Sequence, residues 1–332
     1  MKALVYTGPR GLVLRDEPEP SPGEGEVLVR VEAVGICGSD MHAYHGHDER
    51  RPAPLILGHE AAGTLLGGRR AGERVAINPL VSCGRCRFCL DGRGNLCRGR
   101  QVLSLPPRAG AFAERVIVPE ANLVAVPEGL GVVQAALAEP MAVAWHAVRI
   151  GARALARPLA ASPCVVLGGG AIGLAAALVL GIFGARGVAV AETNALRRKT
   201  AAAAGPFFPF APGGAGEPEA GTVDLVIDAV GAEATRAAAC RLAAPGGVIV
   251  HIGLLPGAGG LDVRRMTLQE ITVLGSYCYT KVDFAETVAA LGAGCFGPLG
   301  WIEERALKEG PRAFADLDGG RVAAAKIVLR PG

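Results

Sequence analysis

The sequence has no strong excess of either charge and few aromatic residues. Its 34 Lys and Arg face 31 Asp and Glu, giving a formal net charge of +3, and aromatics make up 5% of the 332 residues. This balance excludes a chain-wide field that would draw the protein to nucleic acid or an anionic membrane. A hydrophobic content of 50% and a mean hydropathy of +0.34 exclude disorder and suggest about two globular domains.

An apolar leader is also missing. The opening MKALVYTGPR holds five apolar or aromatic residues before a Gly-Pro break, which is too short for the core of a signal peptide. We therefore expect a cytoplasmic protein whose nine cysteines are thiols rather than disulfides.

One uncharged and strongly apolar run, from Pro163 to Ala185, needs separate attention. Its length would allow a membrane span, but it contains six glycines and no second candidate span accompanies it. A strand and helix buried in a parallel α/β unit are equally apolar, so we expect no membrane segment.

The pattern of apolar residues divides the chain into two parts. Up to about residue 140, alternating segments such as GEVLVRVEAVGI and AFAERVIVP predict a β-rich domain. Beyond residue 142, short apolar runs alternate with Ala-rich helical stretches, which predicts βαβ units and a parallel sheet. We expect helices over 283–291 and 303–314 and a closing strand in AAKIVLRPG. Prolines make a regular strand doubtful in the 205–221 loop, which holds at most one short strand.

A glycine motif indicates a dinucleotide site. Gly168, Gly170 and Gly173 form G-x-G-x-x-G with Ala171 and Ile172 between the last two. The motif follows the buried-strand pattern CVVLG, opens an apolar helix and precedes a strand that ends in Glu192. A carboxylate there accepts hydrogen bonds from ribose hydroxyls and repels a 2′-phosphate, which favours NAD over NADP. The alternative is a Gly-rich turn in an unrelated α/β domain with Glu192 on the surface.

Four cysteines crowd into fifteen positions, namely Cys83, Cys86, Cys89 and Cys97. The spacing C-x2-C-x2-C-x7-C lets four thiolates converge on one structural zinc with no open position. Nearby arginines can partly offset the negative charge of such a centre. A nucleic-acid-binding zinc ribbon and an iron–sulfur cluster are alternatives, but Phe88 is the lone aromatic residue of the loop and offers no stacking platform.

A second set of potential ligands is dispersed along the chain. ICGSDMH contains Cys37, GHEAAG contains His59 and Glu60, and AEPMAVAWHAV contains Glu139. Cysteine, histidine and carboxylate together suit a catalytic zinc with an open position for water or substrate. Taken singly, each residue also fits a purely structural role, as a buried Cys, a core His or a surface Glu.

These motifs, in this order and over nearly the whole chain, resemble the zinc-dependent medium-chain alcohol and polyol dehydrogenases. ICGSDMH and AEPMAVAWHAV are similar to the sorbitol, galactitol-phosphate and threonine dehydrogenase branches. The resemblance implies an α/β protein with two domains. A GroES-like β-rich catalytic domain would comprise residues 1–145 and 282–332, with a structural zinc lobe at about 80–100. A Rossmann domain with a doubly wound parallel sheet would comprise residues 146–281 and bind NAD.

The resemblance also implies roles for individual residues. Cys37, His59 and Glu139 would surround the catalytic zinc, with Glu60 as a direct or exchanging ligand, and Asp40 would hold the ring of His59. Ser39 would take the alcohol proton and pass it through the nicotinamide ribose to His42. Arg197 would assist Glu192 at the adenosine ribose.

The expected function is hydride transfer from a secondary alcohol, most plausibly a polyol or sugar alcohol, to NAD, with two Zn²⁺ per chain. Zinc lowers the pKa of a bound alcohol, while the hydride chemistry belongs to NAD. An L-threonine 3-dehydrogenase-like enzyme is the nearest alternative. A zinc-ribbon nucleic-acid binder and a zinc-independent quinone reductase are more distant ones. We expect a small-molecule substrate, no nucleic-acid or membrane partner, and a homo-oligomer, either dimer or tetramer.

Overall fold

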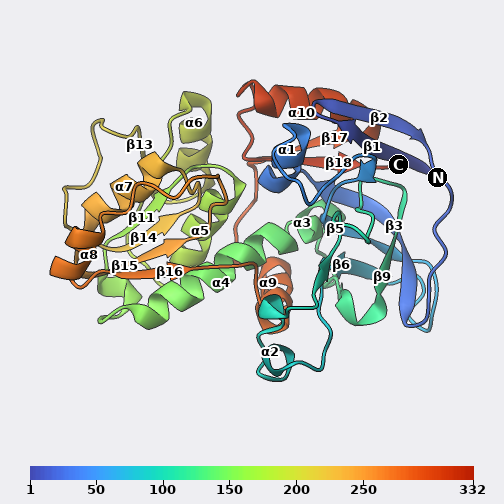
Figure 1. Cartoon of the computed structure of the whole chain (residues 1–332), viewed down its shortest axis with the longest axis horizontal. Coiled ribbons are helices and arrows are strands. Elements are labelled where there is room, and N and C mark those ends of the chain that lie inside the picture. The colour runs from blue at the N-terminus through green and yellow to red at the C-terminus, as the bar shows by residue number, and fades with distance from the viewer.

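The computed structural model describes all 332 residues as two bodies placed side by side (Figure 1). One body carries strands β1–β10 together with β17 and β18, and the other carries β11–β16. The two chain termini lie close together on the first body (Figure 1). The last strands therefore return to the part of the molecule where the chain began.

The first body is built from sheets in which all pairs but β17–β18 are antiparallel. Its largest sheet has the order β10-β6-β5-β3-β18-β17, with β9 also pairing with β3, while β2-β1-β4 and β7-β8 form small sheets. The strands are β1 (Lys2–Gly8), β2 (Gly11–Asp16), β3 (Glu26–Gly35), β4 (Leu55–Ile56), β5 (Glu60–Leu65), β6 (Arg74–Ile77), β7 (Leu80–Val81), β8 (Gln101–Val102), β9 (Arg115–Pro119), β10 (Leu123–Ala125), β17 (Ile302–Ala306) and β18 (Lys326–Arg330). Its short helices are α1 (Gly38–Tyr44), α2 (Arg87–Leu90), α3 (Val132–Ala136) and α10 (Gly310–Asp318).

The second body is one parallel sheet with the order β13-β12-β11-β14-β15-β16. This is the doubly wound dinucleotide-binding order, in which ligands bind at the carboxyl ends of the strands where the order reverses. Its strands are β11 (Cys164–Leu167), β12 (Val188–Ala191), β13 (Phe207–Phe210), β14 (Val223–Asp228), β15 (Ala243–His251) and β16 (Thr272–Gly275). Its helices are α5 (Ala171–Ile182), α6 (Ala195–Ala204), α7 (Glu233–Leu242) and α8 (Val263–Leu268).

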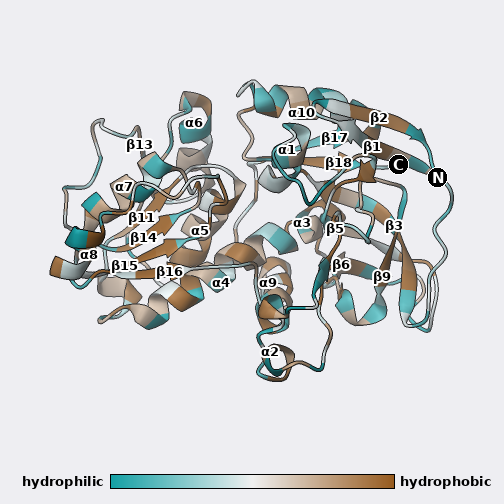
Figure 2. Cartoon of the chain, viewed as in Figure 1, coloured by the Kyte–Doolittle hydropathy of each residue, from teal (hydrophilic) through white to brown (hydrophobic).

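Two helices connect the bodies. Helix α4 (Ala138–Ala154) runs continuously across the boundary expected after residue 145, and α9 (Lys281–Gly292) packs against it. Met141 and Trp145 of α4 belong to a hydrophobic core that also contains Ala62 of β5 and Val166 of β11. The apolar residues of β11, β14 and β15 form the brown centre of the parallel sheet in Figure 2. Burial of one continuous core holds the two bodies together.

The 205–221 segment contains one short strand, as expected, at residues 207–210. The strand is regular despite its proline because β13 lies at the sheet edge, where Pro209 sits opposite Val190 and its missing N–H costs little. Another expectation about local structure needs correction. The helix expected over 303–314 is wrong in its first half. Residues 302–306 form β17, which pairs in parallel with β18, and α10 begins only at Gly310. Pairing with a neighbouring strand overrode the local helix propensity.

The uncharged run from Pro163 divides into β11 and the apolar helix α5, both largely buried. No helix in the molecule is long and apolar enough to cross a membrane.

Candidate active site and metal centres

The four clustered cysteines converge in a loop around α2. Their sulfur atoms all lie within 4.8 Å of one another, with Cys86 Sγ 3.5 Å and Cys83 Sγ 3.9 Å from Cys89 Sγ. Zinc–sulfur bonds of about 2.3 Å in a tetrahedron give sulfur–sulfur edges of about 3.8 Å. The observed separations fit a zinc bound by four thiolates, so this centre is structural.

The backbone lowers the pKa of two of these thiols, Cys83 and Cys86, whereas burial raises that of Cys89 to about 11. Amide groups of Arg85 and Cys86 lower the pKa of Cys83 to about 6, and the Cys83 amide lies 3.5 Å from Cys97 Sγ. Thiolates are the form that binds zinc. All nine cysteines of the chain are free.

This lobe is attached to the connection between β16 and α9. Asn95 Nδ2 donates to the Tyr277 carbonyl oxygen at 2.9 Å, and Arg100 Nε lies 3.3 Å from the Tyr277 hydroxyl. The Arg100 guanidinium also stacks 4.6 Å from the centre of the Tyr277 ring. The lobe therefore reaches a segment that borders the second metal centre.

Cys37, His59 and Glu60 form that second centre, with potential ligand atoms within 4.8 Å of one another. Cys37 immediately precedes α1, and His59 and Glu60 stand where β5 begins beside β3. Gly35 is opposite Glu60, and a Cβ there would come within 2.1 Å of Glu60 Oε2. The glycine leaves the space in which the carboxylate turns toward the cluster.

Neighbouring groups orient and polarise His59. Asp40 Oδ1 lies 3.6 Å from His59 Nδ1, and Asp40 Oδ2 accepts from the Cys37 amide at 3.0 Å. Burial disfavours the charged ring, but Asp40 and Cys37 outweigh it and hold the pKa of His59 well above its usual value. The cluster thus concentrates negative charge in a buried place, which suits a bound cation.

Glu60 shares its charge with a lysine from the far end of the chain. Lys326 Nζ, at the start of β18, donates to Glu60 Oε1 at 2.7 Å and to the Ile36 carbonyl oxygen at 2.8 Å. The amine is equally near Glu60 Oε2, which nevertheless receives no aligned hydrogen bond. That buried oxygen is available as a metal ligand.

Glu139, the fourth expected ligand, is not part of the three-residue cluster. It is buried at the start of α4 and its Oε1 accepts a hydrogen bond of 3.0 Å from the Tyr279 hydroxyl. Burial raises the pKa of Glu139 to about 7, with His59 opposing and Glu60 adding to that shift. The charges of His59 and Glu60 therefore act on the Glu139 carboxyl group. The role of Glu139 as a metal ligand stays a prediction.

Ser39 and His42 lie one turn apart on α1, which places their side chains on one helix face. The Ser39 hydroxyl is 3.5 Å from Arg51 Nη2. Burial lowers the pKa of His42, with Arg51 contributing in the same direction against Asp48, so the ring is neutral near pH 7. A neutral imidazole can accept a proton.

A cavity of about 310 Å³ joins this centre to the glycine motif. It is bordered by Cys37, Lys326, Gly170 and Glu192, among others. A Cβ on Gly170 would meet nothing within 4 Å, so the loop is open to a ligand there. This cavity lies at the amino end of α5, whose unpaired amides favour a phosphate.

The other two glycines of the motif shape the backbone. Gly168 has a φ of +102°, which favours glycine, and a Cβ on Gly173 would come within 1.8 Å of the Gly168 carbonyl oxygen. The motif therefore builds the tight turn and close helix packing of a dinucleotide site.

Glu192 and Arg197 border the same cavity. Glu192 is largely buried; its Oε2 accepts from the Gly169 amide at 2.9 Å and its Oε1 from the Asn194 amide at 2.7 Å. Arg197 Nε is buried without a hydrogen-bond partner. An unsatisfied donor in this position fits a polar ligand that is supplied from outside the chain.

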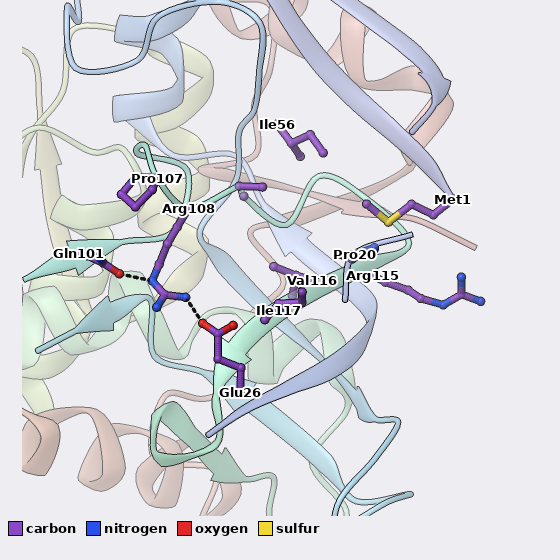
Figure 3. A pocket seen from close by; sticks show the side chains of 12 residues that line it. Met1, Pro20, Glu26, Ile56, Gln101, Pro107, Arg108, Arg115, Val116 and Ile117 are labelled. Atoms are coloured by element: carbon purple, nitrogen blue, oxygen red, sulfur yellow. Dashed lines mark hydrogen bonds and ion pairs between the residues drawn. The ribbon is translucent and has the colours of Figure 1, made fainter. Parts of the chain in front are cut away.

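A second cavity, of about 440 Å³, lies elsewhere on the first body (Figure 3). Arg108 crosses it and donates to Gln101 Oε1 at 2.7 Å and Glu26 Oε1 at 2.9 Å. Its charge is thus neutralised within the chain, and neither metal centre borders this cavity.

Several residues at the site were not among the predicted site residues. Lys326, Tyr279, Ser104 and Arg51 reach it from four separate segments, and Ser104 Oγ lies 3.5 Å from His59 Nδ1. A lysine at the start of the apolar strand KIVL was the one unusual feature that could have drawn notice.

Comparison with known proteins gives the class to which this site belongs. Residues 23–128 match the alcohol dehydrogenase GroES-like domain, and residues 171–293 match the zinc-binding dehydrogenase domain. L-galactonate-5-dehydrogenase of Escherichia coli K12 is 33% identical over 89% of this chain and 88% of its own length. L-threonine 3-dehydrogenase of Streptomyces coelicolor is 34% identical over 99% of both chains.

Solved structures of dehydrogenases share this fold over nearly the whole chain. RspB from E. coli CFT073 in complex with NADH superimposes with a TM-score of 0.88 at 28% identity, covering 99% of both chains. A zinc-binding dehydrogenase from Sinorhizobium meliloti 1021 bound to NADP gives 0.87 at 31% identity, also over 99% of both chains. The chain is a zinc-dependent NAD(P) dehydrogenase of alcohols or polyols. It belongs to the zinc-containing medium-chain alcohol dehydrogenase family.

The two metal centres are expected to be separable. Replacing Cys97, the one buried cysteine of the lobe, by serine should lower bound zinc from two to one per chain and lower the melting temperature. Metal analysis by mass spectrometry together with thermal unfolding measures both quantities. Cys295→Ser, at an exposed cysteine that belongs to neither cluster, is the matched control and should retain both ions. Two ions in the Cys97 variant would contradict a four-thiolate centre.

Proposed function

We propose that this protein oxidises a secondary alcohol group of a polyol or sugar alcohol and uses NAD as the hydride acceptor. The supporting observation is the shared cavity, in which Cys37 of the metal cluster and the glycine loop of the dinucleotide site face the same space. Hydride transfer requires cofactor and alcohol to be held at neighbouring positions. The proposed catalytic domain comprises residues 1–145 and 282–332, and the proposed NAD-binding domain comprises residues 146–281. The reaction is proposed to take place in the cleft between these two domains.

Cys37, His59 and Glu60 are the proposed ligands of the catalytic zinc, with Glu139 as a proposed fourth. Bound zinc supplies a Lewis acid that lowers the pKa of an alcohol, and bound NAD supplies the hydride-accepting ring. Asp40 keeps the ring of His59 in a ligating orientation, and Glu60 retains Lys326 as its buried counter-ion.

Ser39 Oγ is the proposed first acceptor of the alcohol proton, and the neutral ring of His42 is the proposed group that passes it toward water. Their positions one turn apart on α1 and the lowered pKa of His42 support this route. Gly168, Gly170, Ala171, Ile172 and Gly173 are the proposed cradle for the dinucleotide.

L-threonine is the second candidate substrate. The full-length similarity to L-threonine 3-dehydrogenase of S. coelicolor supports it.

The first test is NADH formation from NAD with a panel of polyols, sugar alcohols, L-threonine and primary alcohols. We expect turnover of a polyol, and a zinc chelator should abolish that turnover.

Cys37→Ser should abolish turnover because the metal loses its thiolate ligand, while NAD affinity measured by fluorescence titration stays within about twofold. Cys295→Ser is the control. Chelator-resistant turnover, or an active Cys37 variant, would disprove the zinc assignment.

Preference for NAD over NADP is proposed to come from Glu192. The carboxylate lies in the cofactor cavity and would repel a 2′-phosphate. Glu192→Gln removes the charge but keeps an oxygen acceptor for the Gly169 amide, so the ratio of kcat/KM for NAD to that for NADP should fall about tenfold or more. Glu219→Gln, an exposed residue outside the cavity, should leave the ratio unchanged. An unchanged ratio in the Glu192 variant would show that discrimination lies elsewhere.

A homo-oligomer, dimer or tetramer, is also proposed. Strand β16 is an edge of the parallel sheet, and Leu254, Val263 and Leu268 near it are more than 60% exposed. Apolar groups beside an open strand edge favour association between copies. Light scattering after size exclusion should give a multiple of the 33.8 kDa chain mass, and Val263→Asp should lower it. A monomer at micromolar concentration would contradict the proposal.

A further inference from the structure

One buried arginine belongs neither to the metal centres nor to the cofactor cavity. The chain buries three lysine or arginine side chains, Arg51, Lys326 and Arg236. Arg51 forms an ion pair with Asp48, and Lys326 forms one with Glu60. Arg236, on α7, is 6% exposed, bonds only to backbone carbonyl groups and has no carboxylate within ion-pair distance. A buried cation without a paired anion is costly, so the surroundings of Arg236 need an explanation.

Two of the three guanidinium nitrogens of Arg236 bind the backbone. Nε donates to the Gly259 carbonyl oxygen at 2.5 Å, and Nη1 donates to the Gly231 carbonyl oxygen at 2.6 Å. Nη2 is buried and has no hydrogen-bond partner. A Cβ on Gly257, which has a φ of +109°, would lie 3.6 Å from Nη2. A side chain there would occupy the space beside the unpaired donor, and glycine leaves that space free.

Arg236 borders a cavity of about 300 Å³, which we call the Arg236 cavity. Three of its other lining residues, Asp228, His251 and Gly275, end the parallel strands β14, β15 and β16. It shares no lining residue with the cofactor cavity. Helices α7 and α8 lie at the end of the second body that is remote from the first (Figure 1). The carboxyl ends of parallel strands are the usual place for a ligand in such a sheet.

His251 is the second polar group that a ligand could reach. Its Nδ1 lies 3.1 Å from Asp228 Oδ2, and because a carboxylate only accepts, Nδ1 carries a proton. Its Nε2 forms no hydrogen bond within the chain and is the atom left for a ligand. Asp228 is fully buried and also accepts from the Val230 amide at 3.1 Å, the Gly231 amide at 2.9 Å and the Thr235 hydroxyl at 3.1 Å. These donors fill its acceptor capacity and fix the ring of His251.

The other acidic residues on the adjoining elements do not pair with Arg236. Glu233 is exposed at the start of α7, and Asp262 caps α8 by accepting from the Arg265 amide at 2.9 Å. Asp228 is therefore the one carboxylate that borders the cavity. Arg236 and Asp228 balance in charge, but only Asp228 has its hydrogen-bonding capacity filled. What the cavity lacks is an acceptor for Arg236 Nη2.

We propose that the Arg236 cavity binds a phosphate group, either as inorganic phosphate or as the end of a small phosphorylated metabolite. One phosphate oxygen would accept from Arg236 Nη2, and another would face His251 Nε2. A phosphate suits both forms of the ring, because its oxygen accepts from a protonated imidazole and its P–OH donates to a neutral one. A carboxylate has no such proton to donate near neutral pH. The volume leaves room for further atoms beyond the phosphate.

Calorimetric titration with sodium phosphate tests this site. The zinc-loaded enzyme is saturated with NADH, because phosphate could otherwise bind at the amino end of α5. Sodium chloride keeps the ionic strength constant. We expect one phosphate per chain with a Kd of about 1 mM or tighter, and a rise in melting temperature when phosphate replaces chloride. Glycerol 3-phosphate and acetate are titrated in the same way.

Substitutions locate the binding. Arg236→Gln should weaken phosphate binding about tenfold or more, because a charged donor is lost. His251→Val removes Nε2 with a residue that suits a strand and should weaken binding about threefold. Arg265→Gln is the matched control. Arg265 also donates to two backbone carbonyl oxygens, forms no ion pair and does not border the cavity, so its loss should change the Kd less than about twofold.

Each outcome decides the proposal. An unchanged Kd in Arg236→Gln would overturn it, and if that variant does not fold, an unchanged Kd in His251→Val would do so. Absence of phosphate binding to the wild-type enzyme up to about 50 mM, or acetate binding as tightly as phosphate, would overturn it as well. Tighter binding of glycerol 3-phosphate than of inorganic phosphate would support a phosphorylated metabolite as the ligand, and the reverse order would support free phosphate.

Discussion

A buried ion pair between Lys326 and Glu60 ties this protein together. The lysine opens the strand that returns to the first body at the end of the chain, and the glutamate opens the strand that carries the metal cluster. Both side chains are almost fully buried, and removing one partner of such a pair typically costs about 3–5 kcal/mol because the other charge is stranded. The same amine donates a hydrogen bond to the Ile36 carbonyl oxygen next to Cys37. The residue that joins the last strand to the sheet therefore also positions the metal centre.

The arrangement of charge around this pair explains how one cleft can serve metal, cofactor and alcohol. Negative groups gather at the metal cluster and around Asp40, and helix α5 presents its amino end to the cavity beside the cluster. This separation lets a cation and a phosphate group bind close together without competing for the same side chains.

Much of this could be predicted from the sequence because its signals are local. The spacing of Cys83 to Cys97, the glycines from Gly168 to Gly173 and the alternation of apolar residues each depend on a few neighbouring positions. Local signals left the regularity of the strand at Pro209 in doubt and misplaced one helix. A strand formed at Pro209 because the sheet edge tolerates proline, and β17 replaced half of an expected helix because β18 offered it a partner. In both cases the decisive neighbour lies in another segment.

By itself, the sequence determined the family resemblance, the two-part fold, the cysteine lobe and the dinucleotide loop, since each is encoded within a short window where backbone geometry follows residue type. Only the tertiary structure decided which carboxylate joins Cys37 and His59, that Glu139 rests on Tyr279, and that Lys326 neutralises Glu60. It also decided that Arg51 reaches the Ser39 hydroxyl and that Arg100 reaches the Tyr277 hydroxyl. These contacts join residues up to 266 positions apart, and no periodicity or spacing records such distances.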